Sequence, residues 1–170
     1  RKSYSEAYAA GRTHINNLLN QMWSTAIFEI DPNNEGGADV VWEWHLWDHL
    51  IQDENPTAEN FGIVEEHPEL FDINNGQIGG DMFLPSGDWM HCNTISYNLQ
   101  LDQIVISSRF QDEIYVIDHS TSTLEASGHS GGIYGSGGDL LYRWGNPLNY
   151  NRGDNAYQLL DDQHSINWIP

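Results

Sequence analysis

The sequence predicts an all-β protein that forms part of a β-propeller with long loop insertions. Two observations lead to this prediction. Short runs of alternating apolar and polar residues follow one another after small turns, at residues 90–97, 103–109, 113–119 and 139–145. In addition, a strand ending in aspartate, a turn and a strand containing tryptophan occur twice. Repeated four-stranded units of about 40–50 residues are typical of propeller blades.

The internal repeat supports this architecture. Residues 26–31 (AIFEID) resemble residues 113–118 (EIYVID), and residues 40–44 (VVWEW) resemble residues 140–144 (LLYRW). Both pairs occur in the same order, with turn-rich sequence between them. The repeat therefore indicates that the two segments are equivalent parts of successive blades.

We expect a single partial propeller domain over residues 1–170. Residues 22–45 would be the outer two strands of one blade, residues 89–145 a whole blade, and residues 163–170 the inner strand of the next. Residues 46–88 would be an insertion. Because inner strands line the channel of a propeller, His91 and His164 would converge there from adjacent blades.

The remaining elements follow in chain order. Residues 1–21 contain helix formers at 6–10 and predict a short helix and a loop. Strands at residues 22–31 and 39–45 flank a turn at 32–37 and form a hairpin. The insertion favours one short helix near residues 62–70 and a loop at 76–87. Residues 127–138 are rich in Gly and Ser but lack the spacing and the basic residue of a phosphate-binding loop, so we interpret them as a mobile loop.

Composition limits the possible partners. The chain has 170 residues and a net charge of −19, from six basic and 25 acidic residues. Nucleic acids and anionic membrane surfaces bind basic patches, so neither is expected as a partner. The single cysteine excludes an intrachain disulfide framework, and no apolar run of about 18 residues predicts membrane insertion. The chain starts without methionine or a signal peptide, and we expect it to be an internal piece of a longer protein.

The richest stretch for chemistry lies between Asp88 and Arg109. Alternation places His91, Asn93 and Ile95 on one face of a strand. A turn near residues 98–102 would bring the following strand back beside it and place Arg109 nearby. A histidine, a carboxamide and a guanidinium from neighbouring strands would form an oxyanion pocket.

At these residues the sequence resembles the bacterial arylsulfate sulfotransferase family. The resemblance rests on Trp89-x-His91-x-Asn93-Thr94-Ile95, on Ile106-Ser107-Ser108-Arg109 and on Gln163-His164, and residues 139–147 (DLLYRWGNP) look typical of its blades. It implies a six-bladed propeller, of which this chain would supply about two to three blades, in the periplasm or outside the cell. It also implies transfer of a sulfuryl group from an aryl sulfate to a phenol without a nucleotide or any other cofactor.

The resemblance further implies a role for each site residue. His164 would correspond to the nucleophile that forms a sulfo-histidine intermediate, and His91, Asn93 and Arg109 to the groups that stabilise the sulfuryl oxygens. His91 can also protonate the departing phenoxide. Family members use a further histidine from an earlier inner strand, and no residue of this sequence corresponds to it.

Simpler interpretations stand beside these roles. His91 and Asn93 can be hydrogen-bonded residues at the end of a strand, and His164 can merely begin one. Arg109 can form an ion pair with Asp112 or Glu113. The alternative function is a non-catalytic propeller module that binds an anionic or glycan ligand or a protein, because a fold does not determine a function.

Three other features favour structural explanations. His45 and His49 are four residues apart, but their context is strand-like and lacks an obvious third ligand, so no metal site is expected. Residues 31–36 resemble half of a calcium loop, yet Trp42 stands where the distal glutamate would be. Cys92 would face away from His91. Tryptophans are expected to pack between blades, or in one case to stack on an aromatic substrate, at positions 42, 44, 89, 144 and 168.

Overall fold

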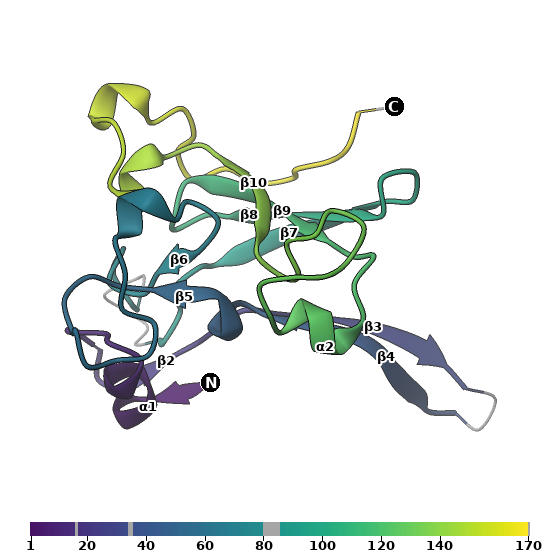
Figure 1. Ribbon diagram of the computed structural model, residues 1–170, viewed down its shortest axis with the longest axis horizontal. Coiled ribbons are helices and arrows are strands. Elements are labelled where there is room, and N and C mark those ends of the chain that lie inside the picture. The colour runs from purple at the N-terminus through teal and green to yellow at the C-terminus, as the bar shows by residue number, and fades with distance from the viewer. Residues whose placement is uncertain (16, 34–35, 80–85, 170) are drawn as a thin grey trace.

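The computed structural model describes residues 1–15, 17–33, 36–79 and 86–169 (Figure 1). Strands predominate, so the predicted all-β class is confirmed. In chain order the elements are β1 (Lys2–Ser3), α1 (Tyr4–Ala9), β2 (Gln21–Met22), β3 (Ala26–Pro32), β4 (Ala38–His45), η1 (Leu46–His49), β5 (Leu50–Ile51), η2 (Val64–Glu66), β6 (Phe71–Asp72), β7 (Cys92–Asn98), β8 (Gln103–Ser108), β9 (Glu113–Asp118), α2 (Thr123–Ala126), β10 (Leu140–Trp144), η3 (Pro147–Tyr150) and η4 (Asn155–Tyr157). Parts of the expected turn (34–35), of the insertion loop (80–85) and of the last strand (Pro170) lie outside the described residues.

A four-stranded antiparallel sheet in the order β10-β9-β8-β7 forms the centre of the molecule (Figure 1). It follows the chain as a meander, with Val105 of β8 opposite Ser96 of β7 and Val116 of β9. The four strands predicted within residues 89–145 are all present in this sheet. From Ile104 to Ser108, every residue of β8 is buried, so both faces of that strand are covered.

The predicted hairpin forms from β3 and β4, which pair antiparallel. Its first strand starts at Ala26 instead of Met22. The reason is that Gln21 and Met22 pair with β1, which turns the chain before β3 begins. The far end of the hairpin projects from the rest of the molecule (Figure 1), and its apolar side chains there are exposed, namely Phe28, Ile30, Val40 and Val41.

Short helices begin where capping residues allow. Ser3 and Glu6 form a capping box at α1, and Ser122 and Glu125 form the same arrangement at α2. The helix predicted near residues 62–70 is the single 3₁₀ turn η2. The Gly/Ser-rich segment after α2, interpreted from the sequence as a mobile loop, forms hydrogen bonds in the structure. Its backbone bonds to itself, as in Gly138 N–H to Gly128 carbonyl at 3.0 Å, and to the side chain of Ser120.

Tryptophans fill much of the core between the hairpin, the insertion and the sheet. Trp42, Trp44 and Trp89 are buried as expected. Trp144 is exposed, which corrects its predicted packing role. A register shift between Leu140 and Tyr142 in edge strand β10 leaves Leu140 buried and turns Trp144 outward. Trp168 is half-buried, and its indole N–H donates to the Ser96 carbonyl at 3.2 Å.

The last described residues, 163–169, form no strand. They run along β7 through hydrogen bonds that involve side chains. Ser165 N–H donates to Thr94 Oγ1 at 2.9 Å, and the Ser96 hydroxyl donates to Asn167 Oδ1 at 2.9 Å. The assignment of this run to a further blade stays a prediction.

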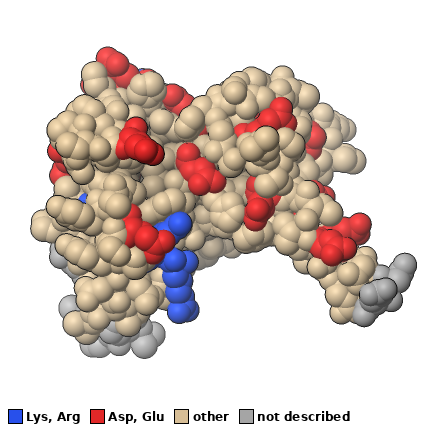
Figure 2. Space-filling view, turned by 60° about the horizontal axis from the view of Figure 1, so that its bottom comes forward, with Lys and Arg blue, Asp and Glu red and all other residues tan. Residues whose placement is uncertain are grey.

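Acidic side chains are dispersed over the face drawn in Figure 2, whereas the largest basic area lies at one place near its centre. Within the described residues, no helix has the length and apolar character needed to cross a lipid bilayer.

Candidate active site

His91 lies just before β7, at the end of the sheet where β7 begins and β8 ends. This position corrects the expectation of a regular alternating strand. His91 has a left-handed backbone, with φ of 46°, and β7 contains a register shift between Cys92 and Thr94. The carboxylate of Asp88 fixes this turn, because it accepts the His91 backbone N–H at 2.9 Å and Nδ1–H at 2.6 Å.

The end of β8 places Arg109 beside His91. The Arg109 backbone N–H donates to the His91 carbonyl at 3.2 Å, which extends the ladder between β7 and β8 by one bond. The imidazole of His91 packs against the ring of Phe110, with 4.7 Å between the ring centroids. The two predicted site residues are therefore direct neighbours in the structure.

The side chain of Arg109 forms an ion pair with Asp162, and not with Asp112 or Glu113. Nε donates to Oδ1 at 3.0 Å and Nη2 donates to Oδ2 at 2.9 Å, the two-bonded arrangement that guanidinium and carboxylate prefer. The hydrogen bond from Arg109 lowers the pKa of Asp162, and electrostatic interactions with Arg109, His164 and His91 lower it further. Both histidines therefore lie within electrostatic range of one carboxylate.

Asn93 joins the sheet to the segment that carries His164. Its Nδ2 donates to the Gln163 carbonyl at 2.8 Å. Gln163 in turn donates from Nε2 to the carbonyls of Ser108 and Glu113, at 2.8 and 2.9 Å. Because these carbonyls lie at the end of β8 and the start of β9, Gln163 fixes the segment to the sheet end.

His164 is exposed at this place. Its Nδ1 lies 3.0 Å from the Asp162 carbonyl, which can only accept a hydrogen bond. The proton is therefore on Nδ1, and Nε2 carries the lone pair in the neutral ring. No described residue bonds this Nε2.

The structure thus brings together all four predicted site residues, His91, Asn93, Arg109 and His164. It adds three residues that sequence reasoning did not assign a role, namely Asp88, Asp162 and Gln163. Asp88 had a usable signal, since a carboxylate three residues before a histidine can cap its turn. Asp162 had none, because its partner Arg109 is 53 residues away.

A cavity of about 400 Å³ opens next to Asn93. It lies between β3 and β7, and Asn93 and Thr94 form its polar part. The other lining side chains are mainly apolar and include Ile27, Phe28, Ile95 and Ile106. Cys92 also lines it, with Sγ 3.5 Å from Oγ1 of Thr25, the residue just before β3.

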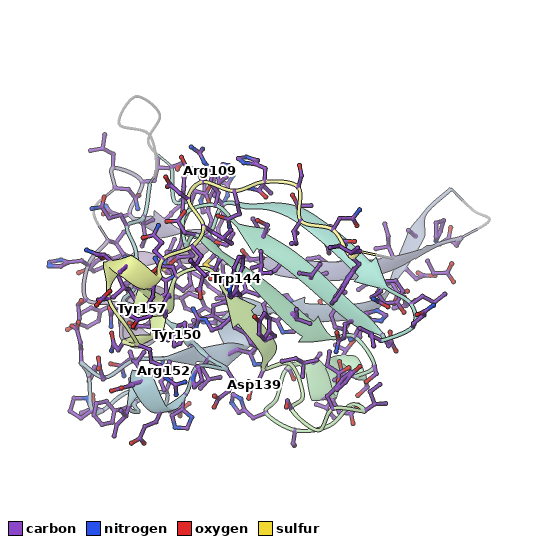
Figure 3. The ribbon with its side chains drawn as sticks, turned by 90° about the horizontal axis from the view of Figure 1, so that it is seen from above. Arg109, Asp139, Trp144, Tyr150, Arg152 and Tyr157 are labelled. Atoms are coloured by element: carbon purple, nitrogen blue, oxygen red, sulfur yellow. The ribbon has the colours of Figure 1, made fainter. Side chains whose placement is uncertain are left out.

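The arrangement can bind an anion and attack it. The guanidinium, the amide and two imidazoles offer donors, and one imidazole presents a free lone pair. Figure 3 shows Arg109 at the edge of the molecule, close to the end of the sheet. In the structure, the Asp162 carboxylate accepts the two hydrogen bonds that the guanidinium could donate to an oxyanion.

Comparison with known proteins gives one family. The arylsulfotransferase (ASST) family matches residues 9–130 of the chain. The matched stretch includes His91, Asn93 and Arg109 and ends before Asp162 and His164. No curated protein and no solved structure gives a significant match.

Proposed function

The chain belongs to the arylsulfotransferase family, and from this premise we propose that it carries a site for transferring a sulfuryl group from an aryl sulfate to a phenol. The observation that supports the proposal is that Asp162 contacts both Arg109 and His164. Arg109 donates to its carboxylate, and Nδ1 of His164 donates to its backbone carbonyl. A nucleophile next to a fixed cation is what attack on a sulfate ester requires.

In the proposed first step, His164 Nε2 attacks the sulfur of the aryl sulfate. A nitrogen–sulfur bond forms, the bond from sulfur to the aryl oxygen breaks, and the phenoxide leaves with that electron pair. His91, in its doubly protonated form, supplies its Nε2 proton to the phenoxide. In the second step His91 takes the proton of the acceptor phenol, and the phenol oxygen attacks sulfur. The nitrogen–sulfur bond breaks, and its electron pair returns to His164 Nε2.

Hydrogen bonds already in the structure support this division of roles. The Asp162 carbonyl holds the proton of His164 on Nδ1, so the lone pair faces outward on Nε2. Asp88 holds Nδ1 of His91 at 2.6 Å, which orients that ring. No described residue bonds the other nitrogen of His91, which remains available for proton transfer.

Arg109 is proposed to bind the sulfuryl oxygens. Two oxygens of a sulfate ester can accept the paired N–H bonds of a guanidinium, so the ester can replace the Asp162 carboxylate at Arg109. Asn93 adds an amide at the same place. The exchange needs little energy because the ion pair of Arg109 and Asp162 is solvent-accessible.

The cavity between β3 and β7 is the proposed site for an aromatic ring of donor or acceptor. Its apolar lining provides contact area, and its polar end at Asn93 and Thr94 faces the segment that carries His164. No nucleotide is needed in this scheme, because the aryl sulfate itself supplies the activated group.

We also propose that the four-stranded sheet is one blade of a propeller and that β3 and β4 belong to the preceding blade. The meander order of the sheet and the separate hairpin support this. A periplasmic or extracellular location goes with the same proposal. An experimental structure of the full-length protein would test the blade arrangement.

The test of the function is the intact mass of the full-length protein after brief exposure to nitrophenyl sulfate. We expect a gain of about 80 Da, one sulfuryl group, together with release of nitrophenol. His164→Asn should abolish both signals. His67→Asn, which changes another exposed histidine away from the site, should leave them unchanged.

The outcomes separate the two functions considered. Adduct and phenol release that persist in His164→Asn would overturn the role of this residue. Binding of the aryl sulfate without adduct or release would favour the non-catalytic binding module.

A further inference from the structure

Three ligand-type side chains from distant parts of the chain meet at the other end of the sheet from Arg109. They are His49 at the end of η1, His129 in the Gly/Ser-rich segment and Asp139 before β10, and their ligand atoms lie within 4.8 Å of one another. Figure 3 shows Asp139 and Arg109 on opposite sides of the molecule. This cluster is therefore separate from the proposed transfer site and does not depend on it.

The hydrogen bonds of His49 leave one of its nitrogens facing an acceptor. Nε2 lies 2.9 Å from the Ala126 carbonyl and must donate, because a carbonyl only accepts. In the neutral ring Nδ1 then carries the lone pair, and it lies 2.8 Å from Asp139 Oδ1. Two acceptors at this distance need either a proton or a metal cation between them.

His129 approaches the same oxygen. Its Nδ1 lies 2.8 Å from Asp139 Oδ1, and its ring stands perpendicular to that of His49, with an interplanar angle of 88°. One carboxylate oxygen is thus the common neighbour of two imidazole nitrogens. The shared cation would be coordinated by both rings and the carboxylate.

We propose that His49, His129 and Asp139 bind one divalent transition-metal ion of the Zn²⁺ class. Two imidazoles and a carboxylate are a ligand set that Zn²⁺ accepts in sites with an open fourth position. The bond from His49 Nε2 to the Ala126 carbonyl is the outer contact that typically orients a metal-binding histidine. This departs from the sequence expectation, which found no third ligand near His45 and His49.

The residues around His49 restrict the position of its ring. Trp44 stacks on it, with centroids 5.6 Å apart and planes within 5°, and the Trp44 indole donates to the Gly138 carbonyl at 2.7 Å. Gly138 has no room for a side chain, since a Cβ there would come within 2.6 Å of His49 Nε2. The ring is therefore fixed by packing and by a close backbone.

The metal can reach this position from solvent. His129 is exposed, and it also lines a cavity of about 550 Å³ together with Trp47, Leu50 and His67. In a tetrahedral site with bonds of about 2.0–2.1 Å, ligand atoms are about 3.3 Å apart. The two distances of 2.8 Å would thus open by about 0.5 Å. Rotation of the Asp139 carboxylate can open its distance to His49, and a shift of the exposed His129 side chain can open the other.

The test uses the full-length protein, treated with a chelator and then dialysed. Calorimetric titration with Zn²⁺ should give one ion per chain, and Co²⁺ should give the visible absorption bands of a low-symmetry site with nitrogen and oxygen ligands. His129→Gln should weaken Zn²⁺ binding about 100-fold and abolish the Co²⁺ bands. This ligand is exposed, so its replacement should leave the fold intact.

His67→Gln is the matched control, because His67 lines the same cavity and pairs with Glu69 but does not belong to the cluster of His49, His129 and Asp139. It should bind Zn²⁺ and Co²⁺ as the unchanged protein does. If His129→Gln unfolds, Asp139→Asn tests the same site by the same two readouts. Absence of stoichiometric binding, or equal loss in His67→Gln and His129→Gln, would overturn the proposal and leave an ion pair between a protonated His49 and Asp139.

Discussion

Arg109 and Asp162 are joined by two parallel hydrogen bonds, Nε to Oδ1 at 3.0 Å and Nη2 to Oδ2 at 2.9 Å. The geometry matches that of a guanidinium bound to an oxyanion. Asp162 thus holds Arg109 in a binding orientation and at the same time competes with any anionic substrate. The balance between these two effects can be measured.

Asp162→Asn should strengthen binding of an aryl sulfate. The amide cannot form both charge-assisted bonds, and it removes a negative charge from the site. Asn also accepts the left-handed backbone of this position, where φ is 52°. We expect the KM for nitrophenyl sulfate to fall about 2- to 5-fold. The change is small because an exposed ion pair stabilises the unbound state only weakly.

Asp161→Asn is the control for charge alone, since Asp161 is a neighbouring exposed acid without a bond to Arg109. It should change KM less than Asp162→Asn does. An increase of KM in Asp162→Asn would contradict this prediction. It would mean that Asp162 helps binding by orienting Arg109 more than it hinders binding by competing with the substrate.

Asp88→Asn should lower the rate of transfer more than it lowers binding. The carboxylate holds Nδ1 of His91 at 2.6 Å, and an amide would hold the ring less firmly. A decrease of about 10- to 100-fold in kcat is expected for an orienting residue of this kind. The decrease in kcat should be larger for aryl sulfates whose phenol is a poor leaving group, because their reaction depends most on proton transfer from His91.

Asp154→Asn is a suitable comparison, because Asp154 only caps η4 through its bond to the Ala156 N–H at 2.8 Å. It should leave kcat unchanged. A loss in Asp88→Asn that is the same for all leaving groups would point to a structural role for Asp88.

Arg143→Met should destabilise the fold strongly. The guanidinium is buried with Glu113, which accepts from Nε at 2.9 Å, and Nη1 donates to the Leu70 carbonyl at 3.0 Å. Removing it leaves a buried carboxylate without its cation, at a cost of about 3–5 kcal/mol. Thermal unfolding should show a melting temperature lower by about 10 °C.

Arg152→Met provides the contrast, because Arg152 is exposed and donates only to the Glu65 carbonyl, at 2.9 Å. Its melting temperature should change by about 1–2 °C. Similar losses in the two variants would contradict the importance of burial.

Asp72 should make stability decrease with rising pH. Burial raises the pKa of its carboxyl to about 6, above the usual value of an unfolded chain. The neutral form is therefore favoured in the folded state. Its contribution to stability is fully present below about pH 4 and is lost as pH rises through about 6.

The measurement is the melting temperature between pH 4.5 and 7.5 for the unchanged protein and for Asp72→Asn. The difference between them should shrink toward low pH, where both side chains are neutral. The expected change is a few degrees, since about 1 kcal/mol corresponds to about 2–4 °C in a chain of this size. A constant difference over the whole range would show that Asp72 does not titrate there.

Local patterns predicted the sheet well. The strands β7 to β10 and the β3–β4 hairpin lie where alternation and turn residues indicated, because these signals depend on neighbours in the chain. The start of β3 was predicted four residues too early, since Met22 looks like a strand residue but pairs with β1. Pairing with a distant partner leaves no local signal.

The sequence indicated which residues would lie near one another but not their contacts, and their role as a site stays a prediction. His91, Asn93, Arg109 and His164 are together, yet His91 is in a capped turn and Arg109 is paired with Asp162. The cluster of His49, His129 and Asp139 shows the same limit, because 90 residues separate His49 from Asp139. Sequence spacing identifies a motif, whereas contacts of this separation arise only from the fold.

The bond from Asn93 to the Gln163 carbonyl joins residues 70 positions apart, and this has a consequence for folding. Closing so long a loop costs entropy before the contact stabilises the chain, so such contacts form late. On a translating ribosome the meander of β7, β8 and β9 can form while His164 has yet to be synthesised. His164 would then dock onto a sheet that already exists, and its segment would be among the first to detach when the native state opens locally.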